Sequence, residues 1–293
     1  MAEGGTLAID LGGSKMLLAL VEAGRVLARM GVPTARMAGP EAWVAQMADL
    51  AQVWDGRFVR AGITVTGLIK DNMWQALNPE TLALPGRFPL HQVAKAALGV
   101  PVTLCNDAQA AAWGEYVQGA GQGRDIVFLT VSTGIGGGVV LGGRLLQGRS
   151  GLAGHFGQTL PQPEGPEMRF EDRASGRWIA AEGARAGKSG DARAVFAAAA
   201  EGQAWADEIV QTSARRVARL CHNLQLMFDP DLFVIGGGVG LAPGYMDRIV
   251  ASVAHVSLLT RPEFIPAALG KDAGVIGVAD LSTRNQPNRD DTT

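Results

Sequence analysis

The feature that most constrains this chain is an internal repeat of a strand, a glycine turn and a second strand. The first copy reaches its turn, Asp-Leu-Gly-Gly-Ser-Lys, at residues 10–15. The second copy reaches its turn, Ser-Thr-Gly-Ile-Gly-Gly-Gly, at residues 132–138. After each turn come another apolar run, a tight turn at 23–24 or 142–143, and a third apolar run. The repeat therefore predicts the same hairpin of three strands in both halves of the chain.

Both glycine turns have the composition of a phosphate-binding loop. Consecutive glycines can adopt a positive φ and bring backbone N–H groups close to an anion. Lys15 would add a positive charge, and the carboxylate of Asp10 could hold Mg²⁺ directly or through water. Glycines that only form tight hairpins are the alternative, which the repeated flanking pattern weakens. The residues predicted to contact the nucleotide here are Ala8, Ile9, Asp10, Leu11, Gly12, Gly13, Ser14, Lys15, Ser132, Thr133, Gly134, Ile135, Gly136, Gly137, Gly138 and Val139.

A third glycine turn follows an apolar run in the second half of the chain. Residues 231–235 predict a buried strand, and three glycines follow it directly. Ligands gather at the carboxyl ends of strands in such sheets. Gly237 and Gly238 could therefore leave room for the base or ribose of a nucleotide. A plain strand-to-helix turn is the alternative interpretation.

Composition argues against several functional classes. The 293 residues are 47% hydrophobic and 18% charged, with a net charge of −2 and two cysteines. This charge gives no general affinity for nucleic acid, and we expect Arg215, Arg216 and Arg219 to form a solvated helix face. We expect neither a signal peptide nor a membrane span, and two cysteines cannot form the disulfide framework of a small secreted protein. We therefore expect a cytoplasmic enzyme with no membrane or nucleic-acid partner.

Five segments resemble a known family, and together they are highly specific. They are residues 7–15, 106–113, 130–140, 151–157 and 174–177. On these segments the chain resembles the ROK family of sugar kinases and repressors, and within it bacterial N-acetylmannosamine kinases. The resemblance implies the actin-like ATPase fold, which is a duplicated, ribonuclease H-like α/β fold with two lobes around a nucleotide and sugar cleft.

The resemblance also implies a division of the chain. Residues 1–105 would form a small N-terminal lobe, completed by a C-terminal helix at about 272–283. Residues 106–271 would form the large lobe, and residues 284–293 a polar tail. The resemblance further implies a homodimer, with ATP and Mg²⁺ as cofactors.

The implied reaction is phosphorylation of N-acetylmannosamine by ATP at the 6-hydroxyl, giving N-acetylmannosamine 6-phosphate and ADP in sialic acid breakdown. Asp107 would accept the proton of this hydroxyl as a general base. Asn106 would hydrogen-bond a sugar hydroxyl, although Asn-Asp after a strand is also typical of a helix cap. Gly67 and Asn78 are further candidates for the sugar pocket.

The sugar-binding segment departs from the family pattern. His155 stands where most members have a Glu, as it does in N-acetylmannosamine kinases, and Glu171 stands at a second sugar-binding position. Gln158 replaces a zinc-binding His, and the family's zinc-binding cysteines are missing. A tetrahedral zinc site therefore cannot form, and we predict that the protein binds no zinc. We expect apolar packing by Met168 and Phe170 to hold the segment instead.

Three functions are compatible with these residues. His155 favours N-acetylmannosamine as the substrate over that of another family hexokinase, such as a glucokinase or fructokinase. The third possibility, of a different class, is a sugar-sensing protein without catalysis. Repressors of the family carry an N-terminal helix-turn-helix, and we expect none here because the first strand is predicted to begin near residue 6. Asp10, Asp107 and the glycine turns favour a kinase.

Overall fold

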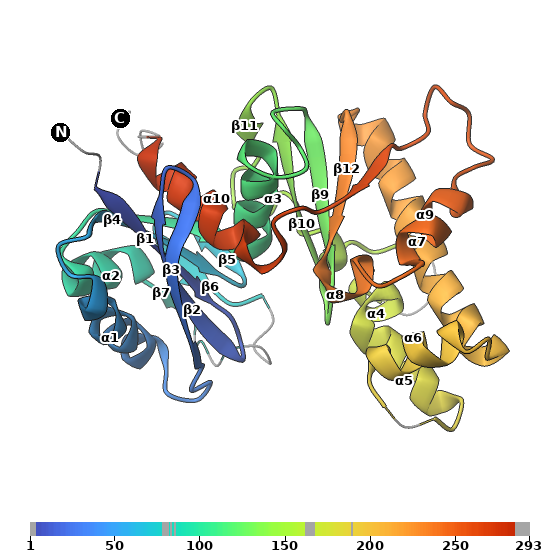
Figure 1. The fold of residues 1–293 in the computed structure, drawn as a ribbon, viewed down its shortest axis with the longest axis horizontal. Coiled ribbons are helices and arrows are strands. Elements are labelled where there is room, and N and C mark those ends of the chain that lie inside the picture. Colours follow the sequence, from blue (N-terminus) through green and yellow to red (C-terminus); the bar gives the residue numbers. More distant parts are fainter. Residues whose placement is uncertain are drawn as a thin grey trace. The chain divides into compact units, whose positions relative to one another are not determined.

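The structure is a computed structural model that describes residues 4–77, 82, 84, 86–161, 168–188 and 190–284. The chain divides into two compact units. Unit 1 contains the residues up to 119, residues 147–152 and those from 271 onward, whereas unit 2 contains residues 120–146 and 153–270. Both units are mixed α/β (Figure 1), which confirms the predicted class.

Unit 1 contains a five-stranded sheet in the order β3-β2-β1-β4-β8. The first three strands are antiparallel, and β4 and β8 run parallel to β1. The turn between β2 and β3 has positive φ at Ala23 (47°) and Gly24 (73°), as a two-residue type I′ hairpin requires. The strands are β1 (Gly5–Leu11), β2 (Lys15–Glu22), β3 (Arg25–Pro33), β4 (Phe58–Val65) and β8 (Val102–Asn106).

Unit 2 repeats this arrangement, in the order β11-β10-β9-β12-β13. The first three strands are again antiparallel, and β12 and β13 run parallel to β9. The turn before β11 has positive φ at Gly142 (54°) and Gly143 (72°). The predicted repeat is therefore confirmed. The strands are β9 (Ile126–Val131), β10 (Ile135–Leu141), β11 (Arg144–Leu145), β12 (Leu232–Gly236) and β13 (Phe264–Pro266).

Helices α3 (Asp107–Val117) and α10 (Ala273–Thr283) pack side by side in unit 1 (Figure 1). A Cβ on Gly277 would lie only 1.8 Å from the carbonyl oxygen of Ala110, so the two backbones are in direct contact. The indole N–H of Trp113 donates to the Asp280 carboxylate (2.8 Å). This packing keeps α3 in unit 1. Unit 1 therefore extends to residue 119, whereas the predicted boundary between the lobes lies at 105–106.

Unit 1 also contains a second, smaller sheet and two further helices. A small three-stranded sheet has the order β5-β6-β7. The Trp74 ring of β6 lies 5.8 Å from that of Trp43 in α1, inside the unit's apolar core. These elements are α1 (Pro40–Ala51), η1 (Gln52–Trp54), β5 (Leu68–Lys70), β6 (Met73–Gln75), β7 (Arg87–Phe88) and α2 (Leu90–Leu98).

Unit 2 is built around the long helix α7 (Ala204–Phe228), whose apolar stripe packs into the unit's core. Arg215 and Arg219 are exposed as predicted, but the prediction for Arg216 is wrong. Its guanidinium stacks 4.6 Å from the Trp178 ring centre, because a planar cation can cover an aromatic face. The other helices are η2 (Phe156–Gln158), α4 (Glu171–Ala174), α5 (Gly176–Arg185), α6 (Ala192–Ala200), α8 (Gly237–Gly240) and α9 (Tyr245–Ser252), with η3 (Gly270–Asp272) leading to α10.

None of the helices in the described part of the chain has the length and apolar character needed to span a bilayer.

Candidate active site

The first glycine turn joins β1 to β2 as a closed loop in unit 1. The Gly12 N–H donates to the carbonyl oxygen of Lys15 (3.0 Å). Thr34, which follows β3, donates its N–H to the Ser14 carbonyl (3.1 Å) and its hydroxyl to the Gly12 carbonyl (2.9 Å). These bonds engage the carbonyl oxygens of Gly12, Ser14 and Lys15 and also the Gly12 N–H, so an anion would have to bind the other N–H groups of the turn.

The positive φ predicted for the turn glycines is wrong. The six turn glycines all lie outside the left-handed region of φ. They are Gly12, Gly13, Gly134, Gly136, Gly137 and Gly138. Close packing is what requires glycine at Gly137. A Cβ on Gly137 would lie 2.5 Å from the Phe128 carbonyl oxygen and 2.6 Å from the Phe156 ring. One on Gly134 would lie 2.8 Å from a carboxylate oxygen of Glu171.

The Lys15 side chain extends along the sheet and not over the first turn. Lys15 pairs with Pro33, and Leu17 pairs with Gly31, which is therefore farther from the turn. A Cβ on Gly31 would lie 2.3 Å from Cε and 2.8 Å from Nζ of Lys15. The ammonium group expected beside a phosphate thus lies over β3.

Asp10 lies near the end of β1, opposite Thr64 of the parallel strand β4. The buried Thr64 hydroxyl donates to the Asp10 carboxylate (3.0 Å). Burial raises the pKa of the Asp10 carboxyl above its usual value, and the bond from Thr64 opposes this shift. A carboxylate oriented in this way is a suitable ligand for Mg²⁺ or its bound water.

Asn106 ends β8 and caps helix α3. Its side-chain oxygen accepts the N–H groups of Ala108 (3.0 Å) and Gln109 (3.1 Å). Its side-chain amide donates to the carbonyl oxygen of Gly67 (3.0 Å). Gly67 has a φ of 101°, and a Cβ there would lie 2.4 Å from the Gln75 carbonyl oxygen, so the position needs glycine. Both residues thus have structural roles, because the Asn106 amide bonds the Gly67 carbonyl and the Asp107 carboxylate.

Asp107 is the first residue of α3, where its carboxylate accepts the Ala108 N–H (2.8 Å). Burial, followed by the negative charge of Asp10, raises the pKa of the Asp107 carboxyl from 3.8 to about 7. Hydrogen bonds from Ala108 and Asn106 lower it in part. A base with a pKa near the working pH is suited to removing a proton from a hydroxyl. Asp10, Asn106 and Asp107 therefore form one cluster in unit 1.

Gln109 connects this cluster to the segment that precedes His155. Its side-chain amide donates to the Gly151 carbonyl (3.1 Å). A Cβ on Gly151, whose φ is 75°, would lie 2.5 Å from the Ile69 carbonyl oxygen. Residues 147–152 are thus held in unit 1, and the chain enters unit 2 at Ala153.

The second glycine turn joins β9 to β10 in unit 2, and the start of α5 fixes it. The N–H groups of Gly176 and Arg177 donate to the carbonyl oxygens of Ser132 (2.7 Å) and Thr133 (3.2 Å). The Ser132 N–H donates to the Gly134 carbonyl (2.9 Å). Thr133 is exposed, so its hydroxyl is accessible to a ligand.

Two glycines place His155 against β10. A Cβ on Gly154 would lie 2.5 Å from the Gly137 carbonyl oxygen, and one on Gly157 would lie 2.1 Å from the Ile135 carbonyl oxygen. His155 itself is half-buried. The structure thus brings His155 and the second glycine turn together within unit 2.

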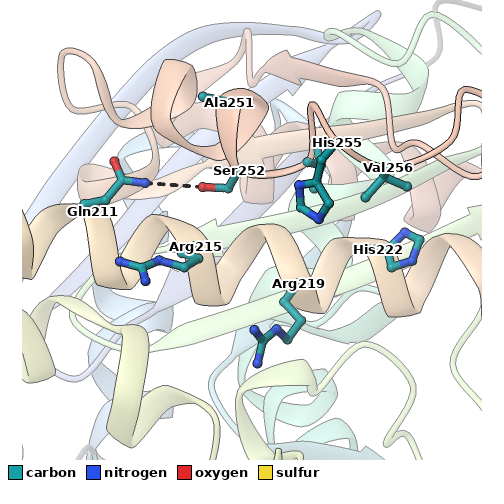
Figure 2. Close-up of a pocket in the computed structure, with 9 residues that line it drawn as sticks. Gln211, Arg215, Arg219, His222, Ala251, Ser252, His255 and Val256 are labelled. Atoms are coloured by element: carbon teal, nitrogen blue, oxygen red, sulfur yellow. Dashed lines mark hydrogen bonds between the residues drawn. The ribbon is translucent and has the colours of Figure 1, made fainter.

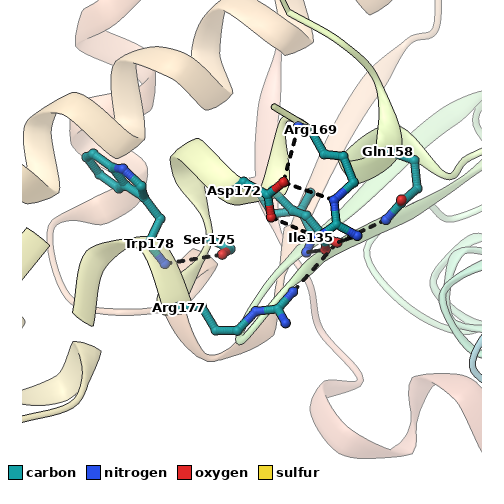
Figure 3. A network of polar contacts seen from close by, with 8 residues as sticks. Ile135, Gln158, Arg169, Asp172, Ser175, Arg177 and Trp178 are labelled. Carbon is teal, nitrogen blue, oxygen red and sulfur yellow. Dashed lines mark hydrogen bonds and ion pairs between the residues drawn. The ribbon is translucent and has the colours of Figure 1, made fainter. Parts of the chain in front are cut away.

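Glu171 is the centre of a polar network beside the same turn. Figure 3 labels its partners Gln158, Arg169 and Arg177. Its carboxylate accepts the Ile135 N–H (3.3 Å) and the side-chain amide of Gln158 (2.9 Å). Arg169 (3.3 Å) and Arg177 (3.6 Å) form ion pairs with it. Only 7% of the Glu171 side chain is exposed. The residue predicted to bind sugar therefore also ties the glycine turn to the His155 segment.

Polar contacts as well as apolar packing hold the segment before α4. Phe170 is buried as expected, but Met168 is 36% exposed, so its predicted packing role is wrong. Arg169 instead forms two side-chain hydrogen bonds with Asp172 (both 2.9 Å). These bonds lower the pKa of the Asp172 carboxyl.

In the third glycine turn, Gly237 is closely packed and Gly238 faces open space. Gly237 has a φ of 86°, and a Cβ there would lie 2.4 Å from the Val131 carbonyl oxygen. Gly238 is exposed and has no atom within 4 Å of a Cβ position. A flat group could therefore approach the backbone at Gly238.

Metal ligands are sparse in the described part of the chain. Within it, no group of three His, Cys, Asp or Glu side chains could hold a metal ion. The absence of zinc remains a prediction. Asn78 lies outside the described residues.

A separate groove in unit 2 contains none of the predicted site residues. Figure 2 shows Arg215, Arg219 and His222 along α7, with Ser252 and His255 on the neighbouring segment. The side-chain amide of Gln211 donates to the Ser252 hydroxyl (3.4 Å) at one end.

Three residues at these sites were missed from the sequence. Thr64 is a polar residue within an apolar strand, which could have indicated a role at the strand end. Gln109 lies one helical turn after Asn106, and nothing in its sequence context distinguishes it from its neighbours. Arg177 ends another such segment, and only its contacts assign it to the glycine turn.

Comparisons with known proteins agree with this architecture. The model of the ROK family matches residues 6–285. The chain is 40% identical to an N-acetylmannosamine kinase from Escherichia coli over 284 residues, which covers 94% of this chain and 98% of that protein. It is 49% identical over 276 residues to a bifunctional enzyme NanE/NanK from Brucella melitensis. The match covers 94% of this chain but only 53% of that relative, so the chain spans about half of its length.

A solved structure supports the same fold. A ROK family glucokinase from Streptomyces griseus, in complex with glucose and AMPPNP, superimposes with a TM-score of 0.81 and 29% identity. The match covers 96% of this chain and all of that one (100%). The expected actin-like architecture is thereby confirmed.

Proposed function

Because the chain belongs to the ROK family, we propose that it is an ATP-dependent kinase that phosphorylates N-acetylmannosamine at the 6-hydroxyl. The products are N-acetylmannosamine 6-phosphate and ADP. Identity of 40% to an N-acetylmannosamine kinase over nearly its whole length supports this substrate. The AMPPNP complex of the related glucokinase supports ATP as the phosphoryl donor.

The observation that carries the proposal is the Asp107 carboxylate at the start of α3. Its pKa of about 7 suits a group that accepts the 6-hydroxyl proton as the phosphoryl group is transferred. The hydrogen bond from the Ala108 N–H holds the carboxylate in one orientation. Asn106 positions α3, and its amide, which bonds Gly67 and Asp107 in this structure, would turn one of these donors to a sugar hydroxyl.

Nucleotide binding is proposed for the glycine turns and for Gly238. Phosphoryl transfer needs positioning and charge stabilisation more than covalent chemistry. Backbone N–H groups of the turns would bind phosphate oxygens, and Asp10 would hold Mg²⁺ directly or through water. Mg²⁺ neutralises the phosphate charge when it is bound with ATP.

His155 is the proposed determinant of sugar choice. It is held beside β10 by Gly154 and Gly157, and its position holds a Glu in most of the family. A glucokinase or fructokinase activity is the alternative within the family. A His155→Glu variant should lower the preference for N-acetylmannosamine over glucose.

The experiment that tests the proposal measures ATP turnover with Mg²⁺ by detecting ADP. The substrates are N-acetylmannosamine, N-acetylglucosamine, glucose, mannose and fructose, with Asp107→Asn as the control variant. We expect strong preference for N-acetylmannosamine, lost in the variant. Preference for another hexose would show that the proposed substrate is wrong. No turnover with any sugar, despite ATP binding, would favour a sugar sensor. The homodimer and the cytoplasmic location remain predictions.

A further inference from the structure

We propose that Arg177 binds the phosphate groups of the nucleotide at the second glycine turn. This inference rests on the proposed kinase function and adds a residue to its site. Arg177 contacts the turn twice, because its N–H donates to the Thr133 carbonyl (3.2 Å) and its guanidinium lies beside Gly134. The nearest nitrogen, Nη2, is 3.9 Å from the position that a Cβ on Gly134 would occupy.

Glu171 holds the Arg177 guanidinium in place, but it does not occupy the N–H groups of that guanidinium with close hydrogen bonds. The two groups are 3.6 Å apart, which is an ion pair but too long for a good hydrogen bond. The same carboxylate accepts closer bonds from Gln158 (2.9 Å) and Ile135 (3.3 Å). Among the residues that the structure describes, this is the one ion pair of Arg177, whose side chain is 42% exposed. Figure 3 shows Arg177 reaching from α5 toward Ile135.

An arginine in this position supplies the positive charge that the glycine turn lacks. The Ser132 N–H bonds the Gly134 carbonyl and the Ile135 N–H bonds the Glu171 carboxylate, so the turn has fewer backbone donors for an anion, and those that remain are neutral. Guanidinium adds a fixed positive charge and a planar fork that can bind two phosphate oxygens at once. The cation predicted for this task in unit 1, Lys15, instead lies over β3. Arg177 is therefore the cation that the structure places at a predicted phosphate turn.

Binding of ATP, ADP and adenosine by calorimetry tests this inference. The variants are Arg177→Gln and Arg177→Lys, with Arg185→Gln as a matched control on the same helix. Arg185 is 70% exposed and pairs with Glu182, away from the turn. Loss of hydrogen bonds to a charged group should weaken ATP and ADP binding by roughly 10- to 100-fold in Arg177→Gln. Adenosine binding should not change, and Arg177→Lys should recover part of the loss because it keeps the charge.

Two results would overturn the inference while leaving the kinase proposal intact. One is unchanged ATP affinity in Arg177→Gln. The other is an equal loss for ATP and adenosine, which would mean that Arg177 only supports the local structure. If the unaltered protein binds no ATP, the kinase proposal fails first and this inference fails with it.

Discussion

Replacing Asp107 by Asn tests the environment that makes this residue a base. The pKa of its carboxyl is about 7 in the folded protein and 3.8 in the reference state for the unfolded chain. Between these values the unfolded chain releases a proton that the folded protein keeps, so stability falls as pH rises and is level above about pH 7. At about 1.4 kcal/mol per pH unit, the raised pKa lowers the free energy of unfolding by about 4 kcal/mol at pH 8.5, where the folded carboxyl is ionised, and by about 2 kcal/mol at pH 5.5, where only the unfolded chain is ionised.

Asparagine is neutral at both pH values and keeps an oxygen for the Ala108 N–H. The variant should therefore gain about 2 kcal/mol of stability relative to the unaltered protein when the pH is raised from about 5.5 to 8.5. Urea unfolding of both proteins at each pH measures this difference, and the variant should show no sugar-dependent ATP turnover. A stability difference that does not change with pH, or that shrinks as pH rises, would refute the reasoning about burial and the charge of Asp10.

Three further predictions concern other parts of the molecule. Asp10→Asn removes a negative charge near Asp107, so the acid limb of the pH profile of kcat/KM should move to lower pH; a shift to higher pH would contradict this. Gly277→Ala should destabilise the protein by about 1–3 kcal/mol in thermal unfolding, because its Cβ would press on the Ala110 carbonyl, while Gly274→Ala, with its nearest atom at 3.8 Å, should have little effect. Treatment with a zinc-selective chelator should leave turnover unchanged when Mg²⁺ is present, and activity restored only by added zinc would disprove the predicted absence of that metal.

The repeated hairpins could be predicted because their signals are local. Each tight turn has a glycine where φ is positive, and the apolar runs on either side have the length of strands. The start of α3 could be predicted for the same reason, because Asn106 and Asp107 follow an apolar strand and precede an alanine-rich helix. Residues adjacent in sequence remain adjacent in the fold, so short motifs are enough to predict these turns and this helix start.

The role of the turn glycines could not be predicted in the same way. The consecutive glycines suggested a positive φ in the turn, but glycine is required at Gly137 because a Cβ there would press on Phe128 and Phe156. That contact joins three segments that are separated in the sequence. The direction of the Lys15 side chain could not be predicted either, because it could extend toward the turn or along the sheet. Gly31 has no side chain, and this leaves the space over β3 that Lys15 occupies.

The sequence by itself determined the duplicated α/β class, the positions of the glycine turns, and Asp107 as the candidate base. Only the tertiary structure decided which groups surround these residues. Thr64 reaches Asp10 through strand register, and Glu171 meets Ile135 and Arg177 through helix packing. The physical reason is that the pKa of a carboxyl and the direction of a guanidinium depend on burial and on charges within a few ångströms, which are supplied by distant parts of the chain.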